Sequence, residues 1–426
     1  MDPAAFEPWR VPLAQWGLVQ LVTGLTVALT PSQSIVRSIA AAIVIALAYS
    51  FQSRVAESFA DTRAGGPLAA MCWVNVLNAI DMLVLSRVSY EAQVEWEAKK
   101  FGDGAPKKAT SDSLKSTLFR RLLWSQNIAF NYRRINTPWQ ISRLPVFDST
   151  NPQYVPTRLK FVLQGSLKVC IAFLLVHLCT MDPSDPRMVG AIAELSDSKM
   201  VLAPWLHGTS ANTILVHAMI TISFGIVCRA SIVGMYSLGG VILVALGVYD
   251  PVEWPPVANS LTEAWSLTRL WGTAWHQVLR TLLVSNADFI SFSVLRISPK
   301  SRWACYLRVL FAFTVSGFIH MGMDLAFGVP RATTGAVWFF CLQALGVLFE
   351  SVFQSLFRVQ IERISPLFRR AMGYVWVALF LLWATPVWLN PIMLCLYKDG
   401  QRGMSPAPII GGLPLYIIDI LRGQVT

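Results

Sequence analysis

The chain has 426 residues, of which 54% are hydrophobic and 14% are charged, and its formal net charge is +11. With a mean hydropathy of +0.51 it is far more apolar than an ordinary soluble globular protein, and that class is excluded. The seven cysteines are odd in number and include no C-x-x-C pair, so we expect buried thiols and no metal site. The composition predicts an all-α, polytopic integral membrane protein.

Apolar runs near the length that crosses a bilayer core recur along the whole chain. Two runs, 212–230 and 231–249, follow each other without a loop, so we expect a helical hairpin whose glycines allow close helix contact. Two weaker runs, at 277–295 and 409–421, bring the expected number of membrane helices to about nine to eleven. The remaining runs lie at 11–29, 34–52, 68–86, 161–181, 303–321, 335–357 and 371–390.

The distribution of charge divides the chain into three regions. Residues 1–86 read as N-terminal membrane helices, 87–160 as a basic polar segment, and 161–426 as a membrane helical core. Between Arg87 and Lys160 there are 13 Lys or Arg against 6 Asp or Glu, so the positive-inside rule places this segment in the cytosol or at its membrane surface. Such charge suits an anionic lipid surface or an anionic cosubstrate, and we expect no nucleic acid partner.

Polar side chains interrupt the third apolar run. Asn75, Asn78 and Asp81 are spaced three apart and share one helical face. We expect hydrogen bonding between helices, with the lining of a substrate cavity as the alternative. Further along, Arg133 and Arg134 are either ligands for a phosphate group or anchors at the membrane boundary.

Residues 265–280 combine tryptophans with basic and polar side chains. An amphipathic helix here would carry the basic and polar residues on one face and the tryptophans on another. An aromatic belt at the membrane interface explains the tryptophans, but it gives no reason for His276 and Gln277. The residues of interest are Arg269, Trp271, Thr273, Trp275, His276, Gln277 and Arg280.

His320 lies deep in an apolar run. An ionisable residue at membrane depth is costly to bury and marks a functional site by default. Ser316 and Asp324 lie four residues to either side, on the same helical stripe as the imidazole. A general base needs one free ring nitrogen and often a second group that fixes its tautomer, and Asp324 is the candidate for that second group.

These motifs carry a resemblance. The sequence S-L-T-R-L-W-G-T-A-W-H-Q, followed about forty residues later by S-G-F-I-H, resembles the wax synthase-like branch of the membrane-bound O-acyltransferase superfamily. More narrowly, it is similar to fungal acetyltransferases of terpenoid, meroterpenoid and trichothecene pathways. The stretch R-R-I-N-T-P-W-Q-I at 133–141 is similar as well. The resemblance implies an MBOAT-like helical core with its motif region at 255–345.

The resemblance also implies an activity. It is transfer of an acetyl group from acetyl-CoA, a cosubstrate rather than a bound cofactor, to a hydroxyl of a hydrophobic molecule in the endoplasmic reticulum membrane. His320 would be the general base and His276 the second catalytic residue. Thr273 departs from the Arg that the family often has there, and Asn136 from a Gly. The implied supporting residues are Asp324, Ser316 and Gln277, and the implied substrate or CoA contacts are Trp271, Trp275, Arg269, Arg280, Arg133 and Arg134.

Three other functions are weighed against this one. A transporter of a small hydrophobic molecule would be supported by internal repeats with broken helices, and we find no convincing repeat. A wax ester synthase would use long-chain acyl-CoA and a fatty alcohol. A prenyltransferase needs Asp-rich motifs for magnesium diphosphate, and the carboxylates of this chain are too sparse.

Overall fold

The fold is that of a computed structural model, which describes residues 9–60, 64–101, 114–180, 192, 195, 211–301, 303–397 and 420. Within these ranges every regular element is a helix, as the composition predicts. The chain divides into two compact units that alternate along the sequence. Unit 1 comprises Met1–Arg143 and Val278–Ala326, and unit 2 comprises Leu144–Gln277 and Phe327–Thr426.

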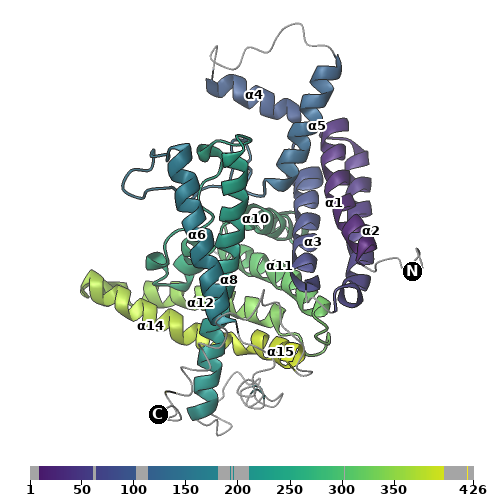
Figure 1. The fold of residues 1–426 in the computed structure, drawn as a ribbon. Helices are drawn as coiled ribbons and strands as arrows, with labels where there is room; N and C mark the ends of the chain where they lie inside the picture. Colours follow the sequence, from purple (N-terminus) through teal and green to yellow (C-terminus); the bar gives the residue numbers. More distant parts are fainter. Residues whose placement is uncertain are drawn as a thin grey trace. The chain divides into compact units, whose positions relative to one another are not determined.

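Unit 1 begins with three apolar helices that lie side by side (Figure 1). These are α1 (Arg10–Leu29), α2 (Ile35–Ser58) and α3 (Gly65–Ile80). The hydroxyl of Ser34 accepts a hydrogen bond from the Val36 amide and so caps the start of α2. Small and branched apolar residues of the three helices form a buried core.

The other elements that the structure describes in unit 1 are two π-helical turns and four further helices. A π-helical turn, Asp81–Leu85, continues α3, and a second, Phe289–Val294, continues α10. Packing of α11 against α3 and α10 buries Val74, Leu282 and Ile319 together. The remaining helices are α4 (Tyr90–Phe101), α5 (Leu114–Phe130), α10 (Arg280–Asp288) and α11 (Ala304–Ala326).

The polar stripe of α3 is buried inside unit 1. The Asn75 side-chain oxygen accepts a hydrogen bond at 2.9 Å from Gln20 of α1. The guanidinium of Arg134 donates to Asn78 and to Asp81, each at 2.8 Å. All three stripe residues have no exposed surface, which confirms the expectation of hydrogen bonding between segments rather than a cavity lining.

Unit 2 is built on a long pair of helices, α6 (Arg158–Cys179) and α8 (Ala211–Ala245), which run alongside each other (Figure 1). Four further helices occupy the second half of its sequence. They are α12 (Ala336–Leu356), α13 (Arg358–Glu362), α14 (Pro366–Ala384) and α15 (Pro386–Tyr397).

The expected hairpin over 212–249 is wrong, because α8 is one continuous helix of 35 residues. No Pro or turn-forming pair stands between the two apolar runs, so the hydrogen-bond ladder continues through them. The glycines serve contacts elsewhere: a Cβ at Gly234 would lie 2.7 Å from the Cβ of Ala172 in α6. Gly247, with φ +75°, lies just beyond the end of the helix.

Eight helices in the described ranges are long and apolar enough to cross a membrane. This number of helices is one lower than the stronger apolar runs predict, because the runs 212–230 and 231–249 form a single helix, α8. The weaker run at 277–295 forms the short helix α10 and its π turn, and all of 409–421 except residue 420 lies outside the described residues. The eight are α1, α2, α3 with its π turn, α6, α8, α11, α12 and α14.

Candidate active site

His320 lies in the membrane helix α11 of unit 1, and the residue is partly exposed. Its Nδ1 atom lies 2.8 Å from the carbonyl oxygen of Ser316, one helical turn earlier. Because a carbonyl oxygen only accepts hydrogen bonds, Nδ1 carries the proton in this contact, and a neutral imidazole then keeps its lone pair on Nε2. The contact selects the tautomer in which Nε2 is the basic atom.

Ser316 and Asp324 share α11 with His320, and both are buried. The Nδ1 contact is with a main-chain oxygen, and the suggestion that Asp324 fixes the tautomer of the imidazole stays a prediction. His177 of α6 makes the same type of contact with Phe173, at 3.1 Å, yet its side chain is only 4% exposed. The greater exposure of the residue therefore distinguishes His320 from His177.

The expected amphipathic helix over 265–280 is wrong. Only Leu267–Arg269 is α-helical, and a π-helical turn, Leu270–Ala274, comes directly after it. Trp275 is extended, with φ −75° and ψ 168°, and helix resumes at Arg280. The basic and polar residues of this segment consequently do not share one helical face.

Hydrogen bonds to the chain around residue 258 replace the missing helical ones. The amide of Gln277 donates to Val257 O at 2.9 Å, and the Asn259 side chain donates to Thr273 O at 3.3 Å. The Gln277 side chain is buried and donates to the carbonyl of Trp275 at 2.9 Å. The structure gives Gln277 a part in holding the loop that carries His276.

Helix α12 fixes the start of the same segment through a buried carboxylate. Glu350 accepts hydrogen bonds from the amides of Leu267, at 2.5 Å, and Thr268, at 3.1 Å, and from the Trp376 indole, at 2.9 Å. An anionic side chain at a helix start also complements the helix dipole. Two turns earlier on α12, a Gln343 oxygen accepts from the Trp271 indole at 3.2 Å.

Glu350 and Gln343 were not predicted from the sequence. They stand seven residues apart in the otherwise apolar run 335–357, and this spacing is the pattern that could have identified a shared polar face.

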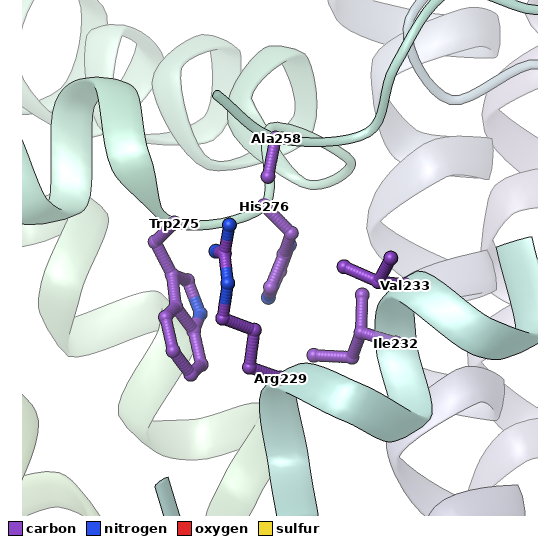
Figure 2. Close-up of a pocket in the computed structure, with 6 residues that line it drawn as sticks. All are labelled: Arg229, Ile232, Val233, Ala258, Trp275 and His276. Carbon is purple, nitrogen blue, oxygen red and sulfur yellow. The ribbon is translucent and has the colours of Figure 1, made fainter. Parts of the chain in front are cut away.

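A small pocket lies beside His276 in unit 2 (Figure 2). In this view the guanidinium of Arg229, from α8, lies between the side chains of Trp275 and His276. It donates to Ala274 O at 2.7 Å and to Asn259 O at 2.9 Å. Arg229 was also missed, although it is a single arginine in the middle of a long apolar run. The pocket is lined by Arg229, Ile232, Val233, Ala258, Trp275 and His276.

Three more residues that the sequence predicts to bind substrate, Arg269, Trp271 and Trp275, contact nearby residues of their own segment. Arg269 pairs with Glu263 and lies over the Trp265 ring, with its Cζ atom 4.7 Å from the ring centroid. Trp271 and Trp275 pack edge to face, with ring centroids 5.6 Å apart. These contacts tie Arg269 to its own segment and leave the two tryptophans as an aromatic pair next to the pocket.

Arg280 begins α10 in unit 1, close to two more arginines. Burial lowers the pKa of Arg280, and the charges of Arg143 and Arg308 lower it further. Asp288 pairs with Arg308 at 2.6 Å, although burial still raises the pKa of its carboxyl group. One carboxylate among three arginines leaves a net positive charge at this place.

Arg134 has no exposed surface and adopts a positive φ of 54°. Its contacts with Asn78 and Asp81 occupy the guanidinium inside unit 1, and Arg133 is only 3% exposed. The structure gives Arg134 an internal electrostatic partner in place of the phosphate that the sequence suggested. Over the described ranges, no group of three or more His, Cys, Asp or Glu side chains is arranged to hold a metal ion.

Comparison with known proteins covers both the motif region and the whole chain. Residues 254–342 match the model of the "Membrane bound O-acyl transferase family". The chain is 26% identical to acetyltransferase aurG of Calcarisporium arbuscula over 90% of this chain and 93% of the relative. It is 29% identical to acetyltransferase fsoF of Humicola fuscoatra over 70% of this chain and 73% of the relative. It is 24% identical to acetyltransferase pyr8 of Aspergillus fumigatus over 93% of this chain and 90% of the relative.

No solved structure matches the chain. The family match covers both motifs, W-H-Q at 275–277 and S-G-F-I-H at 316–320, and the relatives extend over most of the chain. The resemblance that the motifs carry is thereby confirmed: this is a multi-pass membrane protein with a region that matches the membrane bound O-acyl transferase family, and it is similar along most of its length to fungal acetyltransferases.

Proposed function

We propose that this protein is an O-acyltransferase that moves an acetyl group from acetyl-CoA to a hydroxyl of a hydrophobic, terpenoid-type small molecule. The observation that carries the proposal is the state of His320, a partly exposed residue of a membrane helix whose Nδ1 lies at hydrogen-bond distance from the Ser316 carbonyl. The match of 254–342 to the acyltransferase family and the acetyltransferase relatives support the reaction class.

The proposed reaction is a direct transfer. Nε2 of His320 takes the proton of the acceptor hydroxyl while the oxygen attacks the thioester carbonyl. The carbon–oxygen ester bond forms, the carbon–sulfur bond breaks, and the thiolate leaves and recovers the proton from the imidazolium as free CoA. These steps need no covalent acyl-enzyme.

His276 is proposed as the second residue of the reaction, a hydrogen-bond donor to the oxyanion that develops on the thioester carbonyl. This assignment rests on the W-H-Q motif and on the position of His276 at the wall of a pocket in its own unit. Trp275 and Trp271 offer an aromatic surface there for an apolar acceptor.

Arg280 is proposed as a contact for the phosphates of the donor. It is partly exposed and lies near Arg143 and Arg308, where positive charge exceeds negative charge. Arg308 precedes His320 by 12 residues on the same helix, which corresponds to about 18 Å along its axis. A donor with phosphates at this end of α11 and a thioester on an extended arm fits that separation. The endoplasmic reticulum is the proposed membrane.

The proposal is tested with membranes that contain wild type, His320→Ala, His276→Ala or His177→Ala. Acetyl-CoA and a panel of terpenoid alcohols are supplied, and both ester and free thiol are measured. We expect ester formation by wild type, and losses of about 10²–10⁴-fold for His320→Ala and His276→Ala. His177→Ala is the matched control, since it removes a histidine with the same main-chain contact from another membrane helix.

Three results would count against the proposal. Near-wild-type turnover by a folded His320→Ala protein would remove the assignment of the base. Ester formation only with palmitoyl-CoA and hexadecanol, included as a separate arm, would indicate a wax ester synthase. Absence of both ester and protein-dependent thiol release in every arm would contradict the acyltransferase function.

A further inference from the structure

Arg229 lies near the middle of α8, a helix long and apolar enough to cross a membrane. The helix has 35 residues, whereas a bilayer core takes about 20 residues of helix. Arg229 has 18 residues of α8 before it and 16 after it. A cation in the hydrocarbon core is expensive unless it is paired, and it marks a functional role by default.

Arg229 donates hydrogen bonds to two main-chain carbonyls, one on each of the two chain segments that form the loop around His276. One is Ala274 O, at 2.7 Å, two residues before His276. The other is Asn259 O, at 2.9 Å, on the stretch to which Gln277 is bonded through Val257. A planar guanidinium with donors on both outer nitrogens can bridge two such acceptors, and a lysine ammonium lacks this geometry.

We propose that Arg229 is a positioning residue, which sets the direction of the His276 side chain by joining residues 257–259 to residues 273–277. This inference rests on the proposed function, because it gives His276 a task in acyl transfer. Arg229 acts through its hydrogen bonds to the loop and exchanges no proton with the substrate. Without it, Trp275 and His276 lose the bond that fixes the carbonyl just before them.

A second arginine in a membrane helix provides the contrast. Arg37 of α2 also lies in a membrane helix and also bridges chain segments, donating to Thr30 O at 3.0 Å and Val88 O at 2.8 Å. It belongs to unit 1, and these two acceptors lie outside both motifs. Arg37→Lys is therefore the control for Arg229→Lys, since each change replaces a guanidinium that bridges two main-chain carbonyls with an ammonium.

The first measurement is hydrogen exchange of the detergent-solubilised protein, which needs no substrate. In wild type we expect the Gln277 and Asn259 amides to be protected, since both donate to main-chain carbonyls. Arg229→Lys and Arg229→Gln should accelerate exchange in peptides covering 257–277 at least 10-fold, and Arg37→Lys should leave these peptides unchanged. Free exchange of these amides in wild type, or no change in the Arg229 variants, would overturn the proposal.

The second measurement separates positioning from general stability. With acetyl-CoA and an alcohol that wild type esterifies, Arg229→Lys should lower kcat about 10- to 100-fold with KM for acetyl-CoA within 2-fold, because misplacement of a reacting group affects the chemical step. In a His276→Gln background the same substitution should change kcat less than 2-fold. Equal losses in both backgrounds would overturn the proposal, since Arg229 would then act without His276.

Failure of the proposed function gives a different pattern. If His276→Gln retained wild-type kcat while exchange at 257–277 still depended on Arg229, the proposed catalytic role of His276 would be wrong. The hydrogen bonds by which Arg229 holds the loop would still be supported. If His276→Gln lost activity while Arg229→Lys changed neither exchange nor kcat, the proposed function would stand and the inference about Arg229 would fall.

Discussion

The Nδ1 atom of His320 lies 2.8 Å from the carbonyl oxygen of Ser316, so the group that orients the imidazole belongs to the main chain and not to the serine side chain. A main-chain acceptor survives every substitution that preserves the helix. Loss of the hydroxyl and loss of the imidazole should consequently have very different effects.

Ser316→Ala should keep transfer activity within about 3-fold of wild type, because alanine retains the carbonyl and favours helix. His320→Gln should lose about 10²–10⁴-fold, because an amide is not a base. Initial rates of ester formation at equal protein levels compare the two. A loss in Ser316→Ala as large as in His320→Gln would show that the hydroxyl takes part in the reaction.

Arg134→Met should lower the free energy of unfolding by about 3–5 kcal/mol, because it leaves the Asp81 carboxylate buried without its partner. The double variant Arg134→Met with Asp81→Leu should recover part of this loss, since no buried charge remains. Thermal unfolding in detergent, monitored by size-exclusion chromatography, measures both. A double variant less stable than the single one would contradict the pairing as the source of the effect.

Glu350→Gln should loosen the start of the motif segment. The hydrogen bonds that Glu350 accepts include those from the amides of Leu267 and Thr268, and a glutamine offers only one oxygen with an NH₂ group beside it. We expect a cost of about 1–3 kcal/mol and faster amide exchange at these two residues. Glu362→Gln, at an exposed pair with Arg358, is the control and should change stability by less than about 0.5 kcal/mol.

Gly234→Ala should destabilise the packing of α6 against α8 by about 1–3 kcal/mol, because its Cβ would meet Ala172 at 2.7 Å. Gly225→Ala, in the same helix, places its Cβ in open space and should stabilise the helix by about 0.5–1 kcal/mol. Apparent melting temperatures of the two variants in detergent test this contrast. Equal effects would show that helix propensity, not packing, governs this helix.

Sequence reasoning predicted much of the helical architecture, because apolar length is a direct requirement of the bilayer. The buried stripe of Asn75, Asn78 and Asp81 was readable for a similar reason, since three-residue spacing puts polar groups on one face. The predicted break within 212–249 was wrong. The length of the apolar stretch suggested two membrane crossings, but no residue in it ends a helix. Length alone does not set a turn.

The segment at 265–280 resisted prediction for another reason. Its helix ends at Ala274, and hydrogen bonds to residues 257–259, Arg229 and Glu350 hold the segment in place. Arg229 and Glu350 are far along the chain, and local periodicity carries no information about them. His320 was singled out because an imidazole in an apolar run stands out, and His276 through the W-H-Q motif, whereas Gln343 and Glu350 looked like interruptions of one apolar run.

The pairing of Asp81 with Arg134 also bears on how the protein is made. Arg134 comes 53 residues after Asp81, so at about 5–20 residues per second the carboxylate waits roughly 3–10 s for its partner during synthesis. Over that interval α3 carries polar groups that are costly to expose to lipid. We expect α3 to stay beside the insertion machinery until Arg134 has also left the ribosome, and to enter the bilayer fully only then.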